Sequence, residues 1–161
     1  MNPPLEQVME QYANSVYAAA YSLLKNKHDA EDVTQETFLK YYVRKRDFAS
    51  PTHLRAWLLR LAINRAKDIL RSASRRKCVP LEDDPRAYAF PQPESAALFE
   101  AVLALPERYR TAIHLHYYED CSVQEIASIL RVTKQTVKTR LYRGRQLLRA
   151  QFEEGCDNDR P

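Results

Sequence analysis

The sequence predicts an all-α protein: two small helical domains joined by a flexible, proline-rich acidic linker, the second containing a helix-turn-helix. Only two glycines occur in the 161 residues, runs of helix-forming residues are long, and strand-like alternation is rare. Four of the nine prolines fall between residues 79 and 93, and residues 81 to 94 hold four acids and one arginine. Because proline blocks helix continuation, this stretch separates two helical blocks.

The domain boundaries follow from that linker. We expect a first domain at 1–77, the linker at 78–93, a second domain at 94–155 and a tail at 156–161. A domain of this size buries a modest fraction of its surface, so its stability is expected to be marginal and helped by a partner.

Composition also bounds the compartment. The three cysteines are odd in number and far apart, which predicts neither a disulfide framework nor a local zinc site and favours a reducing cytoplasm. The most apolar piece, residues 56–63, is interrupted by Arg60 and is too short to span a bilayer, so no membrane insertion is expected. The net charge of +4 is small, but residues 131–149 hold seven Lys or Arg and no acid.

The first domain reads as helices separated by breaks at 26–29 and 47–52. In its second helix, residues 29–45, apolar side chains point nearly all round the axis, so the helix is either sandwiched or meets another protein. These side chains are Val33, Phe38, Leu39, Tyr41, Tyr42 and Val43. The first half of the helix is acidic, which fits either the helix dipole or a basic partner surface.

The third helix has a broad apolar sector and a narrow polar strip. The apolar residues are Leu54, Leu58, Leu61, Ala62 and Ile69, widened by Ile63, Ala66 and Leu70. The strip consists of Arg60, Asn64, Lys67 and Arg71, spaced i, i+4, i+7 and i+11. Three cations, an amide and the following Arg75 and Arg76 suit a phosphate backbone with a base-reading asparagine; a solubilising strip is the alternative. Arg65 falls inside the apolar sector, so we expect an acid or a carbonyl to pair with it.

Two capped helices in the second domain are separated by a very short turn. Ser122 stands three residues before Glu125, a capping-box spacing, and the helix that follows puts Val123, Ile126, Ala127 and Leu130 on one face. Only Arg131 and Val132 then precede Thr133, a good N-cap for the next helix. Two helices joined this tightly, the second basic, indicate a DNA-binding helix-turn-helix rather than an ordinary helical hairpin.

The second of these helices shows donors on one side only. Val137, Leu141, Gly144 and Leu148 share one side of the helical wheel, while the opposite side carries Gln135, Lys138, Thr139, Tyr142 and Arg143. Lys134 and Gln135 lie in the first turn, where a cation opposes the helix dipole unless phosphate is near. We therefore expect this helix to dock on its own domain and to present the polar side to the major groove.

An enzyme is the alternative from another class, and it rests on His114, His116 and Cys121. Residues two apart on a helix point about 200 degrees away from each other, so the two histidines cannot easily share a metal. No nucleophile set, phosphate loop or carboxylate cluster adds support. We expect no catalytic residue, no metal and no cofactor.

The order of these pieces resembles the bacterial RNA polymerase sigma factors of the small extracytoplasmic-function type. DAEDVTQETFLK (29–40) is similar to the polymerase-binding segment of that family, and LRAWLLRLAINRAKDILR (54–71) is similar to its promoter-melting helix. Residues 105–130 and 132–149 resemble its C-terminal helix-turn-helix domain. A stand-alone helix-turn-helix regulator is the second interpretation, but it leaves Asn64 and its cationic strip without a role.

The resemblance implies partners and roles. Expected partners are core RNA polymerase, promoter DNA and an anti-sigma factor. It places Asp32, Gln35, Glu36 and Phe38 on the polymerase. In the minus-ten region it implies that Phe48 and Asn64 hold a flipped base, while Lys67, Arg71, Arg75 and Arg76 follow the backbone, joined by Arg60 of the strip. It implies that the minus-thirty-five element is contacted by Lys138, Thr139, Tyr142 and Arg143, joined by Lys134 and Gln135 of the first turn.

One departure from the family concerns the turn of the helix-turn-helix. Arg131 stands where related proteins often have glycine. A non-glycine residue with positive φ costs about 1 kcal/mol, which predicts an adjusted turn.

Overall fold

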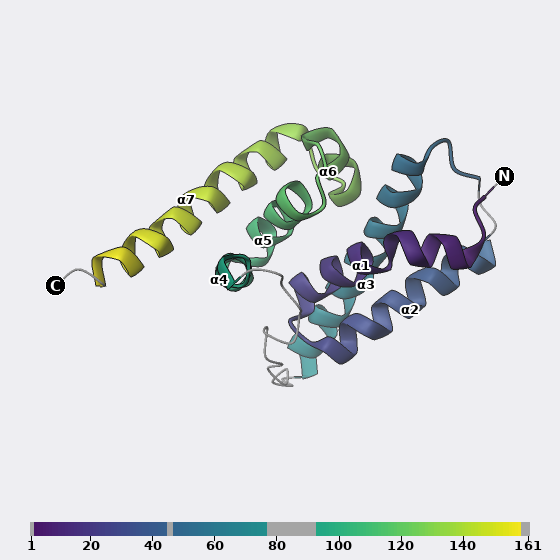
Figure 1. Cartoon of the computed structure of the whole chain (residues 1–161), viewed down its shortest axis with the longest axis horizontal. Helices are drawn as coiled ribbons and strands as arrows, with labels where there is room; N and C mark the ends of the chain where they lie inside the picture. Colours follow the sequence, from purple (N-terminus) through teal and green to yellow (C-terminus); the bar gives the residue numbers. More distant parts are fainter. Residues whose placement is uncertain (1, 45–46, 77–92, 159–161) are drawn as a thin grey trace. The chain divides into compact units, whose positions relative to one another are not determined.

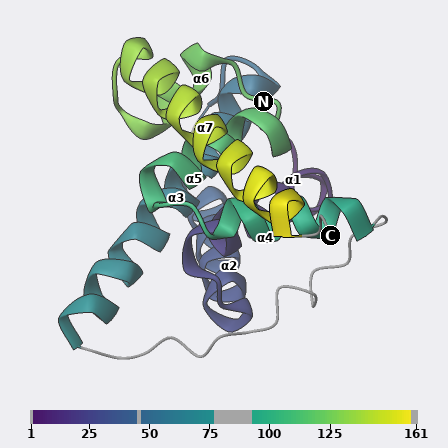
Figure 2. The ribbon, with the colours of Figure 1, turned by 90° about the vertical axis from the view of Figure 1, so that its left-hand side faces the viewer.

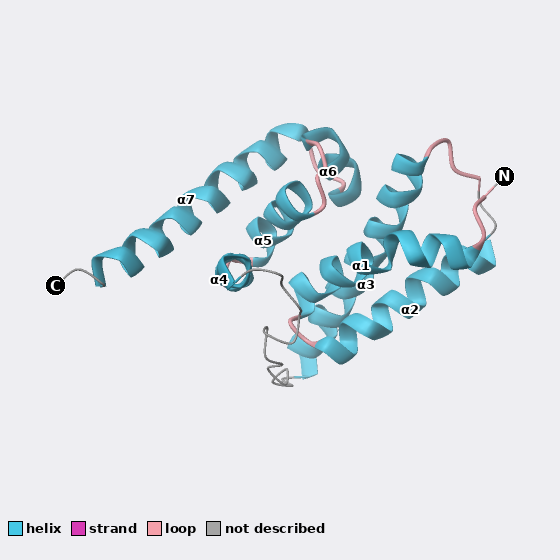
Figure 3. Cartoon of the chain, viewed as in Figure 1, coloured by secondary structure: helices cyan, strands magenta, loops and turns pink. Residues whose placement is uncertain are grey.

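The computed structural model describes the backbone of residues 2–44, 47–76 and 93–158, and the side chains of 2–44, 47–72 and 96–152. All regular structure within these ranges is helical (Figure 3), which confirms the all-α prediction. The chain divides into two compact units, Met1–Asp83 and Asp84–Pro161. Most of the predicted linker lies outside the described residues, and its last residue, Pro93, already opens a helix.

The first unit is a bundle of three helices in mutual contact: α1 (Leu5–Leu24), α2 (Lys27–Arg44) and α3 (Pro51–Arg76) (Figure 1). Its core is built from fully buried apolar side chains, among them Val16, Leu23, Val33, Phe38, Leu58 and Ile63. Leu59 is also fully buried, whereas Leu61 keeps some exposure, so the apolar sector of α3 is rotated slightly from the predicted one.

Both turns of the first unit are tighter than the sequence predicts. Lys25 ends α1 in the left-handed conformation (φ 54°), and the Asn26 side chain then accepts a 2.9 Å hydrogen bond from the Asp29 backbone, so α2 begins at Lys27 and not at 29. The helix α3 begins at Pro51, inside the predicted break, because Ser50 Oγ accepts a hydrogen bond from the His53 N–H. Proline at the first helical position suits this start.

The second unit contains α4 (Pro93–Leu103), α5 (Glu107–Ile113), a π-helical turn (His114–Tyr118), α6 (Val123–Leu130) and α7 (Lys134–Asn158). Each of α4, α5 and α6 contacts α7. The start of α7 lies beside α6, and the helix then continues far beyond it (Figures 1 and 2). The helix α7 continues to Asn158, past residue 155, where the sequence analysis places the end of the second domain.

A buried arginine fixes the corner between α4 and α5. Arg110 donates from Nη1 to the carbonyl oxygens of Leu103 (3.1 Å) and Leu105 (3.3 Å), which are left unpaired where α4 ends. Burial lowers the pKa of Arg110, but the guanidinium still carries its charge at neutral pH. The charged guanidinium of Arg110 therefore binds backbone carbonyls inside the unit and is not part of the surfaces described below.

The helix-turn-helix forms with the predicted caps. Ser122 and Glu125 make the reciprocal capping box of α6, and Thr133 Oγ1 accepts a 3.1 Å hydrogen bond from the Thr136 N–H. The expectation of an adjusted turn is wrong. Arg131 adopts the left-handed conformation (φ 57°, ψ 47°) that glycine would favour, and both its N–H and that of Val132 donate to the Ala127 carbonyl.

Candidate nucleic-acid interface

The two sides of α7 differ as the sequence predicts. Val137, Leu141 and Gly144 are buried against their own unit. The opposite side presents the six residues predicted to face DNA: Lys134, Gln135, Lys138, Tyr142 and Arg143 are exposed, and Thr139 is half-buried. The structure thus brings these six residues together on one accessible surface, which we call the α7 polar face.

Gly144 sets how closely α7 approaches α5. A Cβ atom at this position would lie 2.8 Å from Cγ1 and 3.1 Å from Cδ1 of the buried Ile113. Real Cβ atoms do not approach other carbons so closely, so any side chain here forces the two helices or Ile113 to shift. The α7 polar face is therefore positioned by a contact that only glycine permits.

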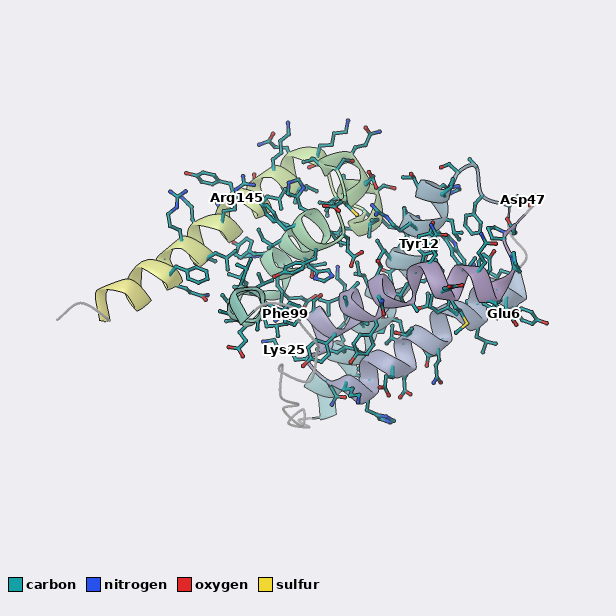
Figure 4. All side chains as sticks on the ribbon, viewed as in Figure 1. Glu6, Tyr12, Lys25, Asp47, Phe99 and Arg145 are labelled. Carbon is teal, nitrogen blue, oxygen red and sulfur yellow. The ribbon has the colours of Figure 1, made fainter. Side chains whose placement is uncertain are left out.

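Several side chains of α7 are held by specific partners. Tyr142 OH accepts a 2.9 Å hydrogen bond from Gln146, and Arg145 donates to Tyr117 OH at 3.1 Å. A hydrogen bond from Arg143 lowers the pKa of Tyr109, whose ring belongs to α5. Two arginines of α7 are thereby tied to α5 and to the π-helical turn that follows it, and the side chain of Arg145 is labelled in Figure 4.

The polar strip of α3 is only partly accessible. Asn64 and Arg71 are exposed, whereas Arg60 and Lys67 are half-buried. Asp68 lies 3.8 Å from Arg71 and neutralises part of the charge. The side chains of Arg75 and Arg76, at the end of α3, lie outside the described residues. The strip is thus a narrow cationic line on a helix that buries one side in the core and leaves its other positions half-buried or exposed.

Phe48, in the loop before α3, is held by three aromatic rings. It stacks on Tyr41 (6.2 Å between centroids, 24°) and meets the edges of Trp57 (5.2 Å) and His53 (5.4 Å). The ring remains half-buried, so part of it stays accessible. This loop is consequently a fixed aromatic platform at the start of α3.

The residues expected to meet the polymerase do not share one environment. Asp32 and Gln35 are exposed on α2, but Phe38 is only 2% exposed and belongs to the core. Phe38 therefore supports this surface from behind and cannot contact a partner directly. Glu36 is half-buried and forms an ion pair with Arg65 of α3, whose Nε lies 2.7 Å from its Oε2.

That ion pair answers the question raised by Arg65. The predicted acidic partner exists, but the side chain is not inside the apolar sector, because 43% of it is exposed. Three of the apolar residues that the sequence analysis placed on α2, Leu39, Tyr42 and Val43, are 61%, 64% and 67% exposed. Apolar residues all round the helix did signal a contact with another protein, but only the structure shows which of them remain uncovered.

The histidines of the second unit serve its packing. His114 is buried, stacks on Tyr118 and lies 3.5 Å from a carboxylate oxygen of Glu119. His116 Nδ1 lies 3.0 Å from the Cys121 carbonyl oxygen. Within the part of the chain that the structure describes, no group of three or more His, Cys, Asp or Glu residues could hold a metal ion. Among the same residues, no helix is long and apolar enough to cross a membrane.

A helix-turn-helix with an exposed cationic face, preceded by a separate three-helix unit with its own cationic line, defines a class: a two-part helical protein of the DNA-binding kind. Each of the two helical units matches a model of a known protein family. Residues 8–76 match the model described as Sigma-70 region 2, and residues 95–148 match Sigma-70, region 4.

Similar proteins narrow the class further. The chain is 37% identical over 157 residues to the extracytoplasmic-function (ECF) RNA polymerase sigma factor SigE of Mycolicibacterium smegmatis, covering 91% of this chain and 61% of that protein. It is 32% identical to the ECF RNA polymerase sigma factor SigW of Bacillus subtilis, covering 91% of this chain and 88% of SigW. The chain belongs to the ECF family of RNA polymerase sigma factors.

Solved structures agree on the fold. The sigma factor RpoE of Bartonella quintana, solved in complex with the anti-sigma factor NepR, superimposes with a TM-score of 0.75 at 25% identity and covers 96% of this chain and 98% of RpoE. CnrH, solved with the cytosolic domain of CnrY, gives a TM-score of 0.68 at 23% identity, over 93% of this chain and 88% of CnrH. As a member of that family, the chain is an RNA polymerase sigma factor that directs transcription initiation.

Proposed function

We propose that the chain binds core RNA polymerase through α2, captures and opens the minus-ten region through the loop at Phe48 and through α3, and reads the minus-thirty-five element through α7. Residues 1–77 would form the polymerase-binding and melting domain, 78–93 the linker and 94–155 the upstream-element domain. The chain itself catalyses no reaction and works in the cytoplasm, where RNA polymerase acts.

The α7 polar face is the observation that carries this proposal. Its residues are accessible, they form one side of a capped helix, and the other side of that helix is locked by Gly144. Arginine and lysine side chains with a tyrosine and a glutamine suit base edges and phosphates in a major groove. Lys134 at the first turn opposes the helix dipole, a cost that a nearby phosphate would offset.

The strip on α3 suits a different form of DNA. It is too narrow to follow both backbones of a duplex, but a single strand needs only one line of cations beside an aromatic surface. Arg60, Lys67 and Arg71 would contact phosphates, and Asn64 would offer an amide to an unpaired base. Arg75 and Arg76 would extend the line of cations along the backbone.

The outer side of α2 suits a protein partner with basic and apolar groups. Asp32 and Gln35 supply exposed polar groups, Glu36 adds a carboxylate oriented by Arg65, and Phe38 anchors the helix beneath them. The exposed Leu39 adds apolar area on the same helix. Such a mixture of apolar centre and polar surroundings is typical of specific interfaces.

An anti-sigma factor is a further proposed partner. The structure of RpoE was solved with the anti-sigma factor NepR, and the similarity to RpoE covers 96% of this chain. The exposed apolar residues of α2 and the cationic faces of α3 and α7 are surfaces that such an inhibitor would need to cover. Held this way, the protein could bind neither polymerase nor promoter.

Run-off transcription from a randomised promoter library tests the proposal. Bacterial core RNA polymerase is assayed with the chain, without it, and with the variant Lys138→Glu/Arg143→Glu, in which the α7 polar face is reversed in charge. Protein-dependent transcripts that share two spaced motifs are expected, with the upstream motif lost for the variant. No transcripts, together with tight binding of duplex DNA by the chain alone, would instead favour a stand-alone regulator.

A further inference from the structure

A cavity of about 300 Å³ lies beside the aromatic platform, between the start of α1 and the loop before α3. Its walls include Gln7, Gln11 and Tyr12 of α1 on one side and Phe48, Ser50 and Pro51 on the other. The start of α1 and this loop lie at the same end of the first unit, where Glu6 and Asp47 are labelled in Figure 4. Asn64 is not among the lining residues, so the cavity is distinct from the α3 strip.

Both lips of the cavity are fixed by tyrosines. Tyr41 OH donates to the carbonyl oxygen of Pro3, at 2.5 Å, and so ties the segment before α1 to α2. Tyr12 OH donates to the carbonyl oxygen of Pro51, at 3.5 Å, and so ties α1 to the first turn of α3. With Phe48 held by its own aromatic neighbours, the cavity is formed before any ligand arrives.

The chemistry of the walls excludes most ligands. None of the described residues that line the cavity carries a charge, so nothing there would compensate a buried phosphate or carboxylate. The walls offer instead two aromatic rings, the apolar side chains of Leu54 and prolines, and three amides, of which those of Gln7 and Gln11 lie one helical turn apart. A flat, neutral molecule with both donors and acceptors on its edge fits this combination, and a nucleobase is such a molecule.

The size of the cavity agrees with a single base. Binding sites for small molecules range from roughly 300 to 1,000 Å³, so this one is at the lower limit and suits one ring system rather than a dinucleotide. Gln7 and Gln11 are exposed and lie on the cavity side of α1. An amide both donates and accepts, so it can pair with two neighbouring atoms on a base edge.

We propose that Gln7 and Gln11 are specificity-determining residues of the minus-ten region, which hydrogen-bond the edge of an unpaired nucleobase seated in this cavity against Phe48. The inference rests on the proposed function, because it requires the non-template strand to open beside α3. It assigns base reading to α1, a helix to which neither the sequence nor the resemblance gave a role. Asn64 does not line the cavity.

The test uses holoenzyme reconstituted from the full chain and bacterial core RNA polymerase. Fork-junction promoters carry each of the four bases, or an abasic residue, at every unpaired non-template position of the minus-ten element obtained by run-off selection. Affinities are measured for the wild type, for Gln7→Ala/Gln11→Ala and for Asn14→Ala. Asn14 is the matched control, because its amide is exposed on the same helix and does not line the cavity.

At one position the wild type is expected to prefer one base by about tenfold, as hydrogen-bonded base contacts generally do. The double variant should lose most of that preference and a large part of the penalty for an abasic residue, and Asn14→Ala should behave as the wild type. All three proteins should bind core polymerase equally and unfold at the same temperature.

Three outcomes would overturn the inference. If the double variant discriminated between bases as well as the wild type at every position, the cavity would have no role in base reading. The proposed function would still stand if the wild type supported run-off transcription. Loss of polymerase binding at unchanged thermal stability would place Gln7 and Gln11 in the polymerase surface instead. Failure of the wild type to support run-off transcription would remove the proposed function and this inference together.

Discussion

The two cationic helices of the molecule, α3 and α7, differ in how they expose their charged side chains and in the form of DNA that they suit. The helix α3 buries one side in the core of its unit and carries a narrow line of cations, two of which are half-buried. The helix α7 is buried only along one seam and exposes an entire side. A line of charge beside a fixed aromatic platform suits one flexible strand, whereas a broad exposed side suits the floor and walls of a duplex groove.

The difference also predicts how each helix tolerates change. On α7 the position of the whole surface depends on the seam, so a fault in packing should disturb every DNA contact together. On α3 the surrounding core holds the helix firmly, so removal of one surface side chain should disturb one contact only. The predictions below test this contrast, beginning with the largest expected effect.

Substitution of Gly144 should have the largest consequence. Gly144→Val places a branched side chain where even a Cβ would meet Ile113 at 2.8 Å, so we expect the second unit to lose roughly 2–3 kcal/mol of stability. Denaturant unfolding followed by circular dichroism measures this loss. Ala150→Val, an exposed position of the same helix, is the control and should change stability little. Equal stability of both variants would mean that α5 and α7 do not pack as described.

Substitution of Arg143 should weaken recognition of the upstream element alone. Loss of one arginine contact to a base typically costs about 1–3 kcal/mol, so Arg143→Ala should reduce transcription from promoters that depend on the minus-thirty-five element. Promoters that depend mainly on the minus-ten region should be affected less. Run-off assays on matched promoter pairs measure the difference, and Arg149→Ala, exposed further along α7, is the control. An equal loss on both promoter types would contradict the assignment.

Substitution of Asn64 should impair promoter opening with polymerase binding intact. One lost amide contact corresponds to about tenfold, or roughly 1.4 kcal/mol, in the population of the open complex. Permanganate reactivity of unpaired thymines measures opening, and Asn14→Ala serves as the control. If Asn64→Ala instead abolished binding to core polymerase, the residue would have a folding role and the assignment would fail.

Much of this contrast could be predicted from the sequence, because its signals are local. The caps at Ser122 and Thr133 and the seam of α7 depend on residues within a few turns, and each is present in the structure. The polar strip of α3 was predicted from the same periodicity. Residues that act across the fold could not be found this way, since no local pattern pairs Glu36 with Arg65 or brings Gln7 beside Phe48.

The turn at Arg131 shows a different limit. The propensity of a single residue predicted an adjusted turn, but the surrounding structure keeps the left-handed conformation in spite of the steric cost. Two capped helices on either side of a short turn fix the path of the backbone, so the tertiary context overrides the preference of one residue. Tertiary packing also decides the place of Phe38. The resemblance matched it to a binding segment, but the side chain is part of the core.

The smallest expected effect concerns the ion pair between Arg65 and Glu36. Both side chains are 43% exposed, so solvent screening limits the pair to about 0–1 kcal/mol despite a separation of 2.7 Å. A double-mutant cycle of Arg65→Ala and Glu36→Ala should give a coupling energy in this range, smaller still at high salt. The more exposed pair of Arg71 and Asp68, 3.8 Å apart on α3, is the control and should show no measurable coupling.

The cycle becomes decisive when polymerase affinity is measured beside stability. If Arg65 orients the Glu36 carboxylate for polymerase, Arg65→Ala should weaken binding by more than it lowers stability, and should do so only while Glu36 is present. A loss of binding that persists in the Glu36→Ala background would mean that Arg65 meets the polymerase itself. In that case the polymerase surface would extend from α2 onto α3, and α3 would contact both polymerase and DNA.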